Sequence, residues 1–135
     1  MSEFLNSNTL TEIGKLILRL TLGILILFHG MDKLVHGIGP IQEMVTGRGL
    51  PGFLAYGVYL GEILGPLLLV AGFHARIGAG LIAINMVIAI LLVHTGDLLG
   101  LSPHGGWRLE LQGMYLFTAL SLMLMGPGRF SLKPH

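Results

Sequence analysis

The sequence predicts an all-α membrane protein, built as an antiparallel bundle of four transmembrane helices. Of its 135 residues, 53% are hydrophobic and only 11% are charged, and the mean hydropathy is +0.78, values far from those of soluble domains. The apolar residues fall into four blocks, each close to the roughly 20 residues that a helix needs to cross a bilayer. We therefore expect one membrane domain over residues 1–135, with helices at about 13–35, 52–73, 77–95 and 107–126.

The first block is expected to remain in the protein as a helix rather than to be cleaved as a signal peptide. Lys15 and Arg19 lie inside its start, and no small-x-small cleavage site follows its long apolar stretch. At the far end of the block, residues 28–37 carry four ionisable side chains on one side of a helix: His29, Asp32, Lys33 and His36. The alternative to a functional polar stripe is an interfacial Asp–Lys pair with histidines that snorkel to the surface.

The second block contains a carboxylate near the middle of its span. Glu62 has no basic residue nearby in sequence, and a charge at this depth costs at least ~2.5 kcal/mol. We expect Glu62 to face the bundle and to be protonated or paired, and an unpaired Glu62 to be neutral and able to donate a hydrogen bond. Pro66 cannot donate the helical hydrogen bond to the Glu62 carbonyl, which predicts a kink at this level. The alternative is a protonated glutamate that serves packing alone.

Small residues and short loops predict how the helices pack. The loops are rich in helix breakers, so neighbouring helices are expected to run antiparallel. Small residues recur every four positions on the second and third helices, where they would let two backbones approach closely in lipid: Gly57, Gly61, Gly65, Ala75, Ala79 and Ala83.

The third and fourth blocks add further polar groups. Asn85 and His94 are nine residues apart, about 180° on an ideal helix, so only one of them is expected to face a narrow pocket. We favour His94, because its expected depth in the membrane matches that of His29 and Glu110. For Glu110 the alternative is a capping or interfacial carboxylate. Each helix would then bring one polar group to the outer half of the bundle: His29, Glu62, His94 and Glu110.

Two histidines and two carboxylates around an apolar cavity suit two kinds of ligand. They are metal ligands, but the paired Glu-x-x-His motif of di-iron bundles is absent, so we expect no metal. They also suit a quinone, whose carbonyl oxygens need proton donors during two-electron reduction and whose tail needs access to lipid. We predict that the catalytic groups are Glu62, His29 and Glu110, and that the quinone-binding groups are His29, Lys33, Glu62, His94 and Glu110.

Charge and cysteine content restrict partners and orientation. The net charge is +1 and the 8 basic residues are scattered, which argues against nucleic acid as a partner. The chain has no cysteine, so electron transfer would need a bound organic cofactor or a soluble or membrane redox subunit. Five basic residues on one side against three on the other predict a multi-pass protein of the inner (cytoplasmic) membrane with both termini in the cytoplasm.

Short motifs follow one another along most of the chain. They are Arg19 early in the first helix, F-x-G-x-x-K at residues 28–33, GEILGPLLLVAGFHAR at 61–76, Trp107 with Glu110, and GPGRFSL at 126–132. In this order and spacing they resemble the DoxX family of small bacterial and archaeal membrane proteins. Family members usually end in Ser-Leu-Asp and often have threonine before the loop arginine. This chain differs from them at Lys133 and Ala75, both outside the expected pocket.

The resemblance implies a link to quinones. The family is named for a component associated with terminal quinol oxidation in an archaeon; some relatives look like the membrane part of thiosulfate:quinone oxidoreductase, and others are linked to oxidative-stress complexes. We therefore expect a quinone-interacting redox subunit or accessory protein, such as a subunit of a quinone-dependent oxidoreductase. A non-enzymatic membrane scaffold or stress-complex assembly factor remains open, as does a small-solute or proton pathway. Substrate, electron donor and self-association are not determined by the sequence.

Overall fold

The described part of the protein is helical along most of its length. The computed structural model describes residues 7–93, 100–101, 103, 105–107 and 109–133. Its elements are α1 (Ser7–His36), α2 (Gly39–Gly47), the 3-10 helix η1 (Gly52–Gly57), the π-helix η2 (Leu60–Leu64), α3 (Gly65–Ala71), α4 (Ala75–Val93) and α5 (Glu110–Met125). One isolated antiparallel bridge joins Leu101 to Trp107. The expected all-α class is confirmed.

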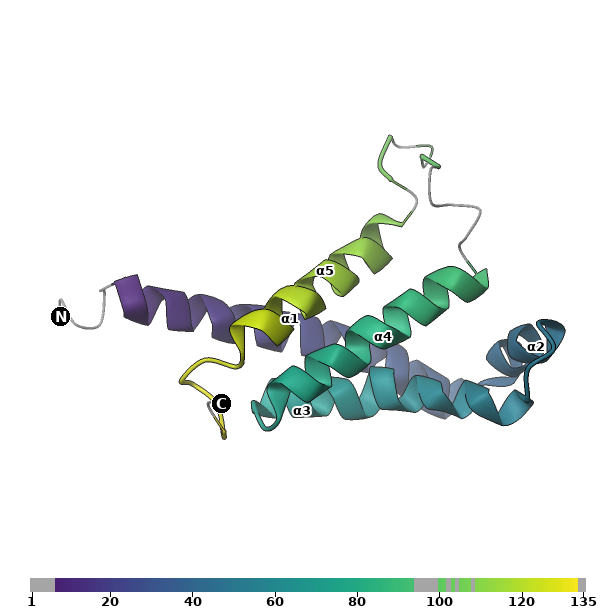
Figure 1. Cartoon of the computed structure of the whole chain (residues 1–135), viewed down its shortest axis with the longest axis horizontal. Helices are drawn as coiled ribbons and strands as arrows, with labels where there is room; N and C mark the ends of the chain where they lie inside the picture. Colours follow the sequence, from purple (N-terminus) through teal and green to yellow (C-terminus); the bar gives the residue numbers. More distant parts are fainter. Residues whose placement is uncertain (1–6, 94–99, 102, 104, 108, 134–135) are drawn as a thin grey trace.

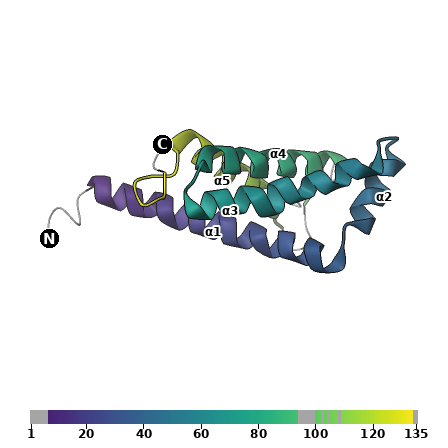
Figure 2. The ribbon, with the colours of Figure 1, turned by 90° about the horizontal axis from the view of Figure 1, so that it is seen from below.

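The long helices pack side by side, and α2 lies at one end of them. The elements η1, η2 and α3 follow each other directly, and Figures 1 and 2 show that this stretch returns beside α1. The helix α1 contacts α3 and α5, and α4 also contacts α3 and α5. Because α2 follows the end of α1 and precedes η1, it lies where the chain turns back (Figure 1). The region of α2 was expected to be a loop, but Pro40 occupies the first turn of a short helix, where its missing N–H costs nothing.

Two helical stretches among the described residues are long and apolar enough to cross a membrane. They are Gly52–Ala71 and Ala75–Leu92. The helix α5 has 16 residues, and α1 carries Lys15 and Arg19 in its first half. Large apolar side chains nevertheless remain exposed on all the long helices, for example Phe28, Val35, Ile84 and Phe117. Apolar surface on this scale is typical of proteins that are covered by lipid or by a partner.

Close backbone approach holds α3 and η2 against α4. A Cβ atom at Gly65 would lie 2.9 Å from the carbonyl oxygen of Gly78, and one at Gly78 would lie 2.6 Å from that of Gly65. A Cβ at Gly61 would collide with the side chain of Asn85. Of the small-residue positions expected to make this contact, Gly61 and Gly65 are buried against α4, whereas Gly57 is exposed.

Gly61→Leu is expected to lower the thermal stability of the detergent-solubilised protein. The Cβ atom alone already overlaps Asn85, and forcing extra atoms into a packed contact typically costs about 1–3 kcal/mol. The matched control is Gly57→Leu, because a Cβ at Gly57 meets nothing within 4 Å. Equal melting temperatures for the two variants would show that this helix contact does not depend on small residues.

A buried arginine ties the C-terminal segment to α1 and α3. The Arg19 side chain, which is 2% exposed, donates hydrogen bonds to the carbonyl oxygens of Leu69 (2.9 Å), Val70 (3.3 Å), Pro127 (2.6 Å) and Phe130 (3.1 Å). These contacts connect three of the motifs found in the sequence: Arg19, the end of the segment 61–76, and GPGRFSL. The motifs at this end of the molecule therefore serve the packing of the chain end.

The same chain end is also fastened near the start of α1. The backbone N–H of Arg129 donates to Glu12 Oε2 at 2.8 Å, and the Arg129 guanidinium donates to Thr9 Oγ1 at 3.2 Å. The hydrogen bond from Arg129 lowers the pKa of the Glu12 carboxyl below its ordinary value. The first turns of α1 and the segment 126–133 consequently lie at the same end of the helices, away from α2 (Figure 2).

Candidate ligand-binding site

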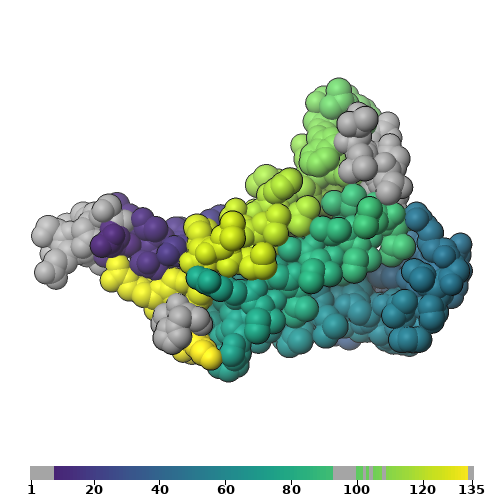
Figure 3. All heavy atoms as spheres, viewed as in Figure 1, coloured from purple at the N-terminus to yellow at the C-terminus, as the bar shows by residue number. Residues whose placement is uncertain are grey.

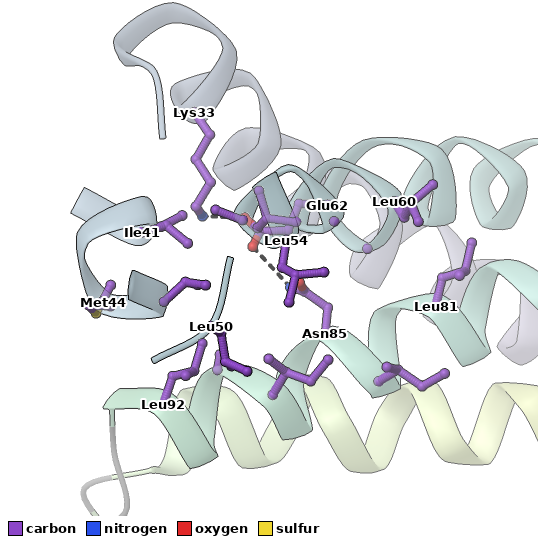
Figure 4. A pocket seen from close by; sticks show the side chains of 18 residues that line it. Lys33, Ile41, Met44, Leu50, Leu54, Leu60, Glu62, Leu81, Asn85 and Leu92 are labelled. Carbon is purple, nitrogen blue, oxygen red and sulfur yellow. Dashed lines mark hydrogen bonds and ion pairs between the residues drawn. The ribbon is translucent and has the colours of Figure 1, made fainter. Parts of the chain in front are cut away.

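Three polar side chains from three helices meet around Glu62. The Lys33 ammonium on α1 forms an ion pair with Glu62 Oε1, and the Asn85 amide on α4 donates to Glu62 Oε2 at 3.0 Å (Figure 4). The Glu62 side chain is 7% exposed and that of Lys33 is 23% exposed. Both carboxylate oxygens of a nearly buried glutamate are thus satisfied by protein donors.

The local backbone around Glu62 is a π-helix. In η2 the N–H of Gly65 bonds to the carbonyl of Leu60, five residues back. Pro66 has no N–H, so the α-helical bond to the Glu62 carbonyl cannot form. The irregularity predicted from Pro66 therefore takes the form of a widened turn, a feature that often occurs at functional sites.

Gly30 brings α1 into contact with this turn. A Cβ atom at Gly30 would collide with the Glu62 carbonyl oxygen and lie 2.7 Å from Ile63 Cγ1. Lys33 lies three residues further along α1, on the same helix face as Gly30. The two backbones can touch at Gly30 only because it lacks a side chain, and this contact places the Lys33 ammonium within reach of Glu62. The motif F-x-G-x-x-K thus has a physical explanation.

Glu62 was expected to be either protonated or paired, and the structure shows the paired arrangement. Its basic partner is Lys33, which lies 29 residues away in sequence on another helix. Lys33 was also a candidate for an interfacial pair with Asp32. Instead, Asp32 Oδ1 contacts His36 Nδ1 at 2.9 Å on the exposed surface.

A large cavity begins at this polar cluster. Its volume is about 630 Å³, and it lies between α2, η1, η2 and α4, with Lys33, Glu62 and Asn85 in its wall (Figure 4). The rest of the wall is mostly apolar and includes Ile41, Leu54, Leu60, Leu81, Ile84 and Leu92. Cavities of about 300–1,000 Å³ with a few polar groups in an apolar wall are typical of small-molecule sites.

The wall of the large cavity reaches the surface of the molecule. Leu60 on η2 and Ile84 on α4 line the cavity and are 51% and 60% exposed. At its other end, Ile41 and Val45 of α2 close the cavity, and the space-filling view shows α2 (blue) against the end of α4 (green) (Figure 3). A second small core around Ile38 and Val45 holds α2 in place. The cavity is therefore open through an apolar rim between η2 and α4.

A smaller cavity lies on another side of the same ion pair. It measures about 140 Å³ and is lined by Lys33 and Glu62 together with Met86 and Ala89 of α4, Gln112 and Tyr115 of α5, and His29 of α1. The His29 and Tyr115 rings meet edge to face, with centroids 5.9 Å apart. The Lys33–Glu62 pair therefore borders both cavities.

The structure brings together only some of the predicted site residues. His29, Lys33 and Glu62 share the smaller cavity. Glu110 is exposed at the start of α5, with its carboxylate beside Gly106, and lines neither cavity. His94 lies outside the described residues.

Sequence reasoning missed two members of the site. Asn85 was ranked below His94 on depth, yet it lines the large cavity and bonds Glu62. The sequence did contain a signal for Asn85, because a lone amide in the middle of an apolar helix needs a hydrogen-bond partner. Tyr115 gave no comparable signal, since tyrosines are common in membrane helices. Among the described residues, no group of three or more histidine, aspartate or glutamate side chains is placed to hold a metal ion.

Comparison with known proteins identifies the family. The profile of the family described as DoxX matches residues 14–95, which is more than half of the chain and includes Lys33, Glu62 and Asn85. The chain belongs to the DoxX family. Within α1 the match begins after Glu12 and covers Arg19 and Gly30, so it contains most of the contacts that build the polar cluster of this DoxX protein.

Two curated relatives agree with this assignment. The chain is 33% identical over 123 residues to a Bacillus subtilis (strain 168) protein named "Putative oxidoreductase CatD", covering 91% of this chain and 87% of the relative. It is 28% identical over 124 residues to "Inner membrane protein YqjF" of Escherichia coli (strain K12), covering 91% and 92%. No solved structure was found to match the chain. The family and these relatives show that this DoxX protein is a membrane protein.

Proposed function

We propose that this DoxX protein is a quinone-binding redox subunit or accessory protein of the inner membrane. The observation that carries the proposal is the large cavity, about 630 Å³, with an apolar rim at the surface and the cluster of Lys33, Glu62 and Asn85 in its wall. A quinone combines a ring that bears two carbonyl oxygens with an apolar tail. The cavity offers polar groups for the ring and an apolar exit for the tail.

The side chains of the cluster fit both redox forms of such a ligand. The Lys33 ammonium and the Asn85 amide are hydrogen-bond donors suited to a quinone carbonyl oxygen. The Glu62 carboxylate is an acceptor suited to a quinol hydroxyl, and it can hold the proton that leaves that hydroxyl. When bound, the quinone would supply two-electron redox chemistry that the cysteine-free chain lacks.

A partner must exchange those electrons. The chain has no cysteine, and the name of the Bacillus relative contains the word oxidoreductase. We therefore propose that a soluble or membrane redox protein supplies or accepts the electrons, while this chain binds and orients the quinone and handles its protons. The name of the Bacillus relative supports the redox role, and the apolar exit supports access from lipid.

Glu62→Gln is expected to leave the protein folded but to abolish quinone-dependent turnover of the assembled complex. Glutamine keeps the shape of the side chain, and its carbonyl oxygen can still accept a hydrogen bond from Lys33 or Asn85. It cannot carry a proton, and general acid–base groups typically contribute 10²- to 10⁴-fold in rate. Glu110→Gln is the matched control, because Glu110 lines neither cavity. If the Glu62→Gln complex bound and turned over quinone like wild type, Glu62 would be a packing residue, and a membrane scaffold would explain the protein better.

We also propose that α1, the stretch η1–α3, α4 and α5 cross the bilayer as an antiparallel bundle with both termini in the cytoplasm. The contacts of Thr9 and Glu12 with Arg129 support termini on the same side, because they hold the start of α1 and the chain end together. The distribution of basic residues supports the cytoplasmic side. Topology reporters fused after residue 135 and in the loop near Gly47 are expected to label opposite faces of the membrane. Labels on the same face would rule out the four-span arrangement.

A further inference from the structure

The two cavities differ in what they can hold. The large cavity has the size of a small-molecule site and an apolar rim. The smaller one, about 140 Å³, is too small for a tailed ring but has room for a few waters, each of which occupies about 30 Å³ in the liquid. Three polar side chains other than the ion pair line the smaller cavity: His29, Gln112 and Tyr115. Its chemistry therefore suits water.

The Glu62 carboxylate borders both spaces, and His29 borders only the smaller one. His29 is exposed on α1 and also lines the smaller cavity. The exposed Asp32 and His36 lie one and two turns further along the same helix face, toward the end of α1, and connect His29 to the surface there. The edge of the His29 ring packs against Tyr115 of α5, which holds the imidazole beside the cavity. A histidine in this position can exchange protons both with the outside and with cavity water.

We propose that the smaller cavity is the proton inlet of the site, with His29 relaying protons through cavity water to and from Glu62. Ligand and protons would then reach the Lys33–Glu62 pair by separate routes, the ligand between η2 and α4 and the protons between α1 and α5. The identity of the ligand rests on the function proposed above. The proton route to Glu62 does not, because it can be observed without a ligand.

Few other ionisable groups compete with this route. Among the described residues that line the two cavities, α1 contributes Lys33 and His29, η2 contributes Glu62, and α5 contributes Tyr115. The helix α4 contributes the amide of Asn85 and no ionisable side chain. The hydroxyl of Tyr59 donates to the backbone carbonyl of Lys33 at 3.3 Å. Lys33 is held in the ion pair with Glu62, and Tyr115 is half-buried, whereas His29 is exposed. His29 is therefore the group that can connect the smaller cavity to the surface.

The proton balance follows from these positions. When a quinol is oxidised, its O–H bond breaks and the Glu62 carboxylate takes the proton, while the electrons pass to the redox partner that accepts them. Glu62 then releases that proton to His29 through cavity water, and the second proton follows by the same steps. In the reducing direction the partner is the electron donor, and each proton travels from His29 to Glu62.

The test measures how fast Glu62 is protonated after a light-triggered pH jump, with the protein embedded in nanodiscs. Protonation is followed by the infrared band of the Glu62 carboxylic acid, and the band is assigned to Glu62 because it should be absent in Glu62→Gln. His29→Leu is expected to slow the appearance of this band at least ~10-fold, and added imidazole should restore the rate. His36→Leu is the matched control, because His36 lies on the same helix but lines neither cavity.

A parallel titration with a short-tailed benzoquinone separates the two proposals. We expect His29→Leu to bind it with wild-type affinity, since His29 does not line the large cavity. If the wild type bound no benzoquinone while His29→Leu still slowed protonation, the quinone function would fail and the inlet would stand. A protonation rate in His29→Leu equal to that of wild type and of His36→Leu would overturn the inlet.

Discussion

Lys33→Met should destabilise the protein by ~3 kcal/mol, and adding Glu62→Leu should recover most of that loss. The single change leaves a carboxylate that is only 7% exposed without its cation, and breaking a buried pair in this way typically costs about 3–5 kcal/mol. We expect a loss at the lower end of this energy range, because Asn85 still donates a hydrogen bond to Glu62. The double variant removes both charges, and replacing a buried pair by apolar side chains is often neutral or stabilising.

The measurement is reversible unfolding of the single and double variants in detergent, analysed as a double-mutant cycle. His36→Leu is the control, because the His36–Asp32 pair is exposed and such pairs contribute about 0–1 kcal/mol. If the double variant were as unstable as Lys33→Met, the loss would come from packing of the lysine stem. A stable double variant that binds no quinone would show that the pair is retained for function, not for folding.

Arg19→Leu is expected to cost at least ~3 kcal/mol and to free the C-terminal segment. The change removes every side-chain hydrogen bond to the carbonyls of Leu69, Val70, Pro127 and Phe130, and hydrogen bonds to a charged group are worth about 1.5–3 kcal/mol each. Buried carbonyls left without a donor add to the loss.

Unfolding and limited proteolysis check this second prediction. Cleavage within residues 126–133 should become fast in Arg19→Leu and stay slow in wild type. Arg129→Leu is the control, because Arg129 is exposed and, within the described part of the chain, its guanidinium donates one hydrogen bond to a side chain, that of Thr9. Equal cleavage rates for Arg19→Leu and wild type would show that other contacts hold the segment.

The class of the protein could be predicted because composition decides it. A chain with 53% hydrophobic and 11% charged residues has to place its apolar side chains against lipid or a partner, whatever the details of its packing. Glu62 could be singled out for a related reason, since a carboxylate in an apolar span must find a donor or a proton. These arguments need no knowledge of which helix lies beside which.

The partners of Glu62 could not be predicted, because they depend on the rotation of each helix. The π-turn of η2 inserts an extra residue in that turn and changes the direction in which Glu62 points, and a regular helical projection does not contain it. Ranking polar groups by depth alone selected Glu110 and His94, whereas Asn85 at mid-span makes the contact. Gly30 was part of a recognised motif, but its role appears only when the backbone of η2 lies against it.

We expect a quinone to bind in the large cavity beside Lys33, Glu62 and Asn85. The most direct measurement is labelling of the nanodisc-embedded protein by a photoreactive short-tailed quinone, with mass-spectrometric mapping of the labelled peptide. Ile88→Trp fills the cavity from α4, whereas Val87→Trp places the same side chain on a neighbouring exposed position that lines neither cavity. We predict saturable labelling of residues that line the large cavity, blocked by unlabelled quinone and by Ile88→Trp but not by Val87→Trp. Labelling that did not saturate, or that Ile88→Trp left unchanged, would show that the large cavity is not a quinone site.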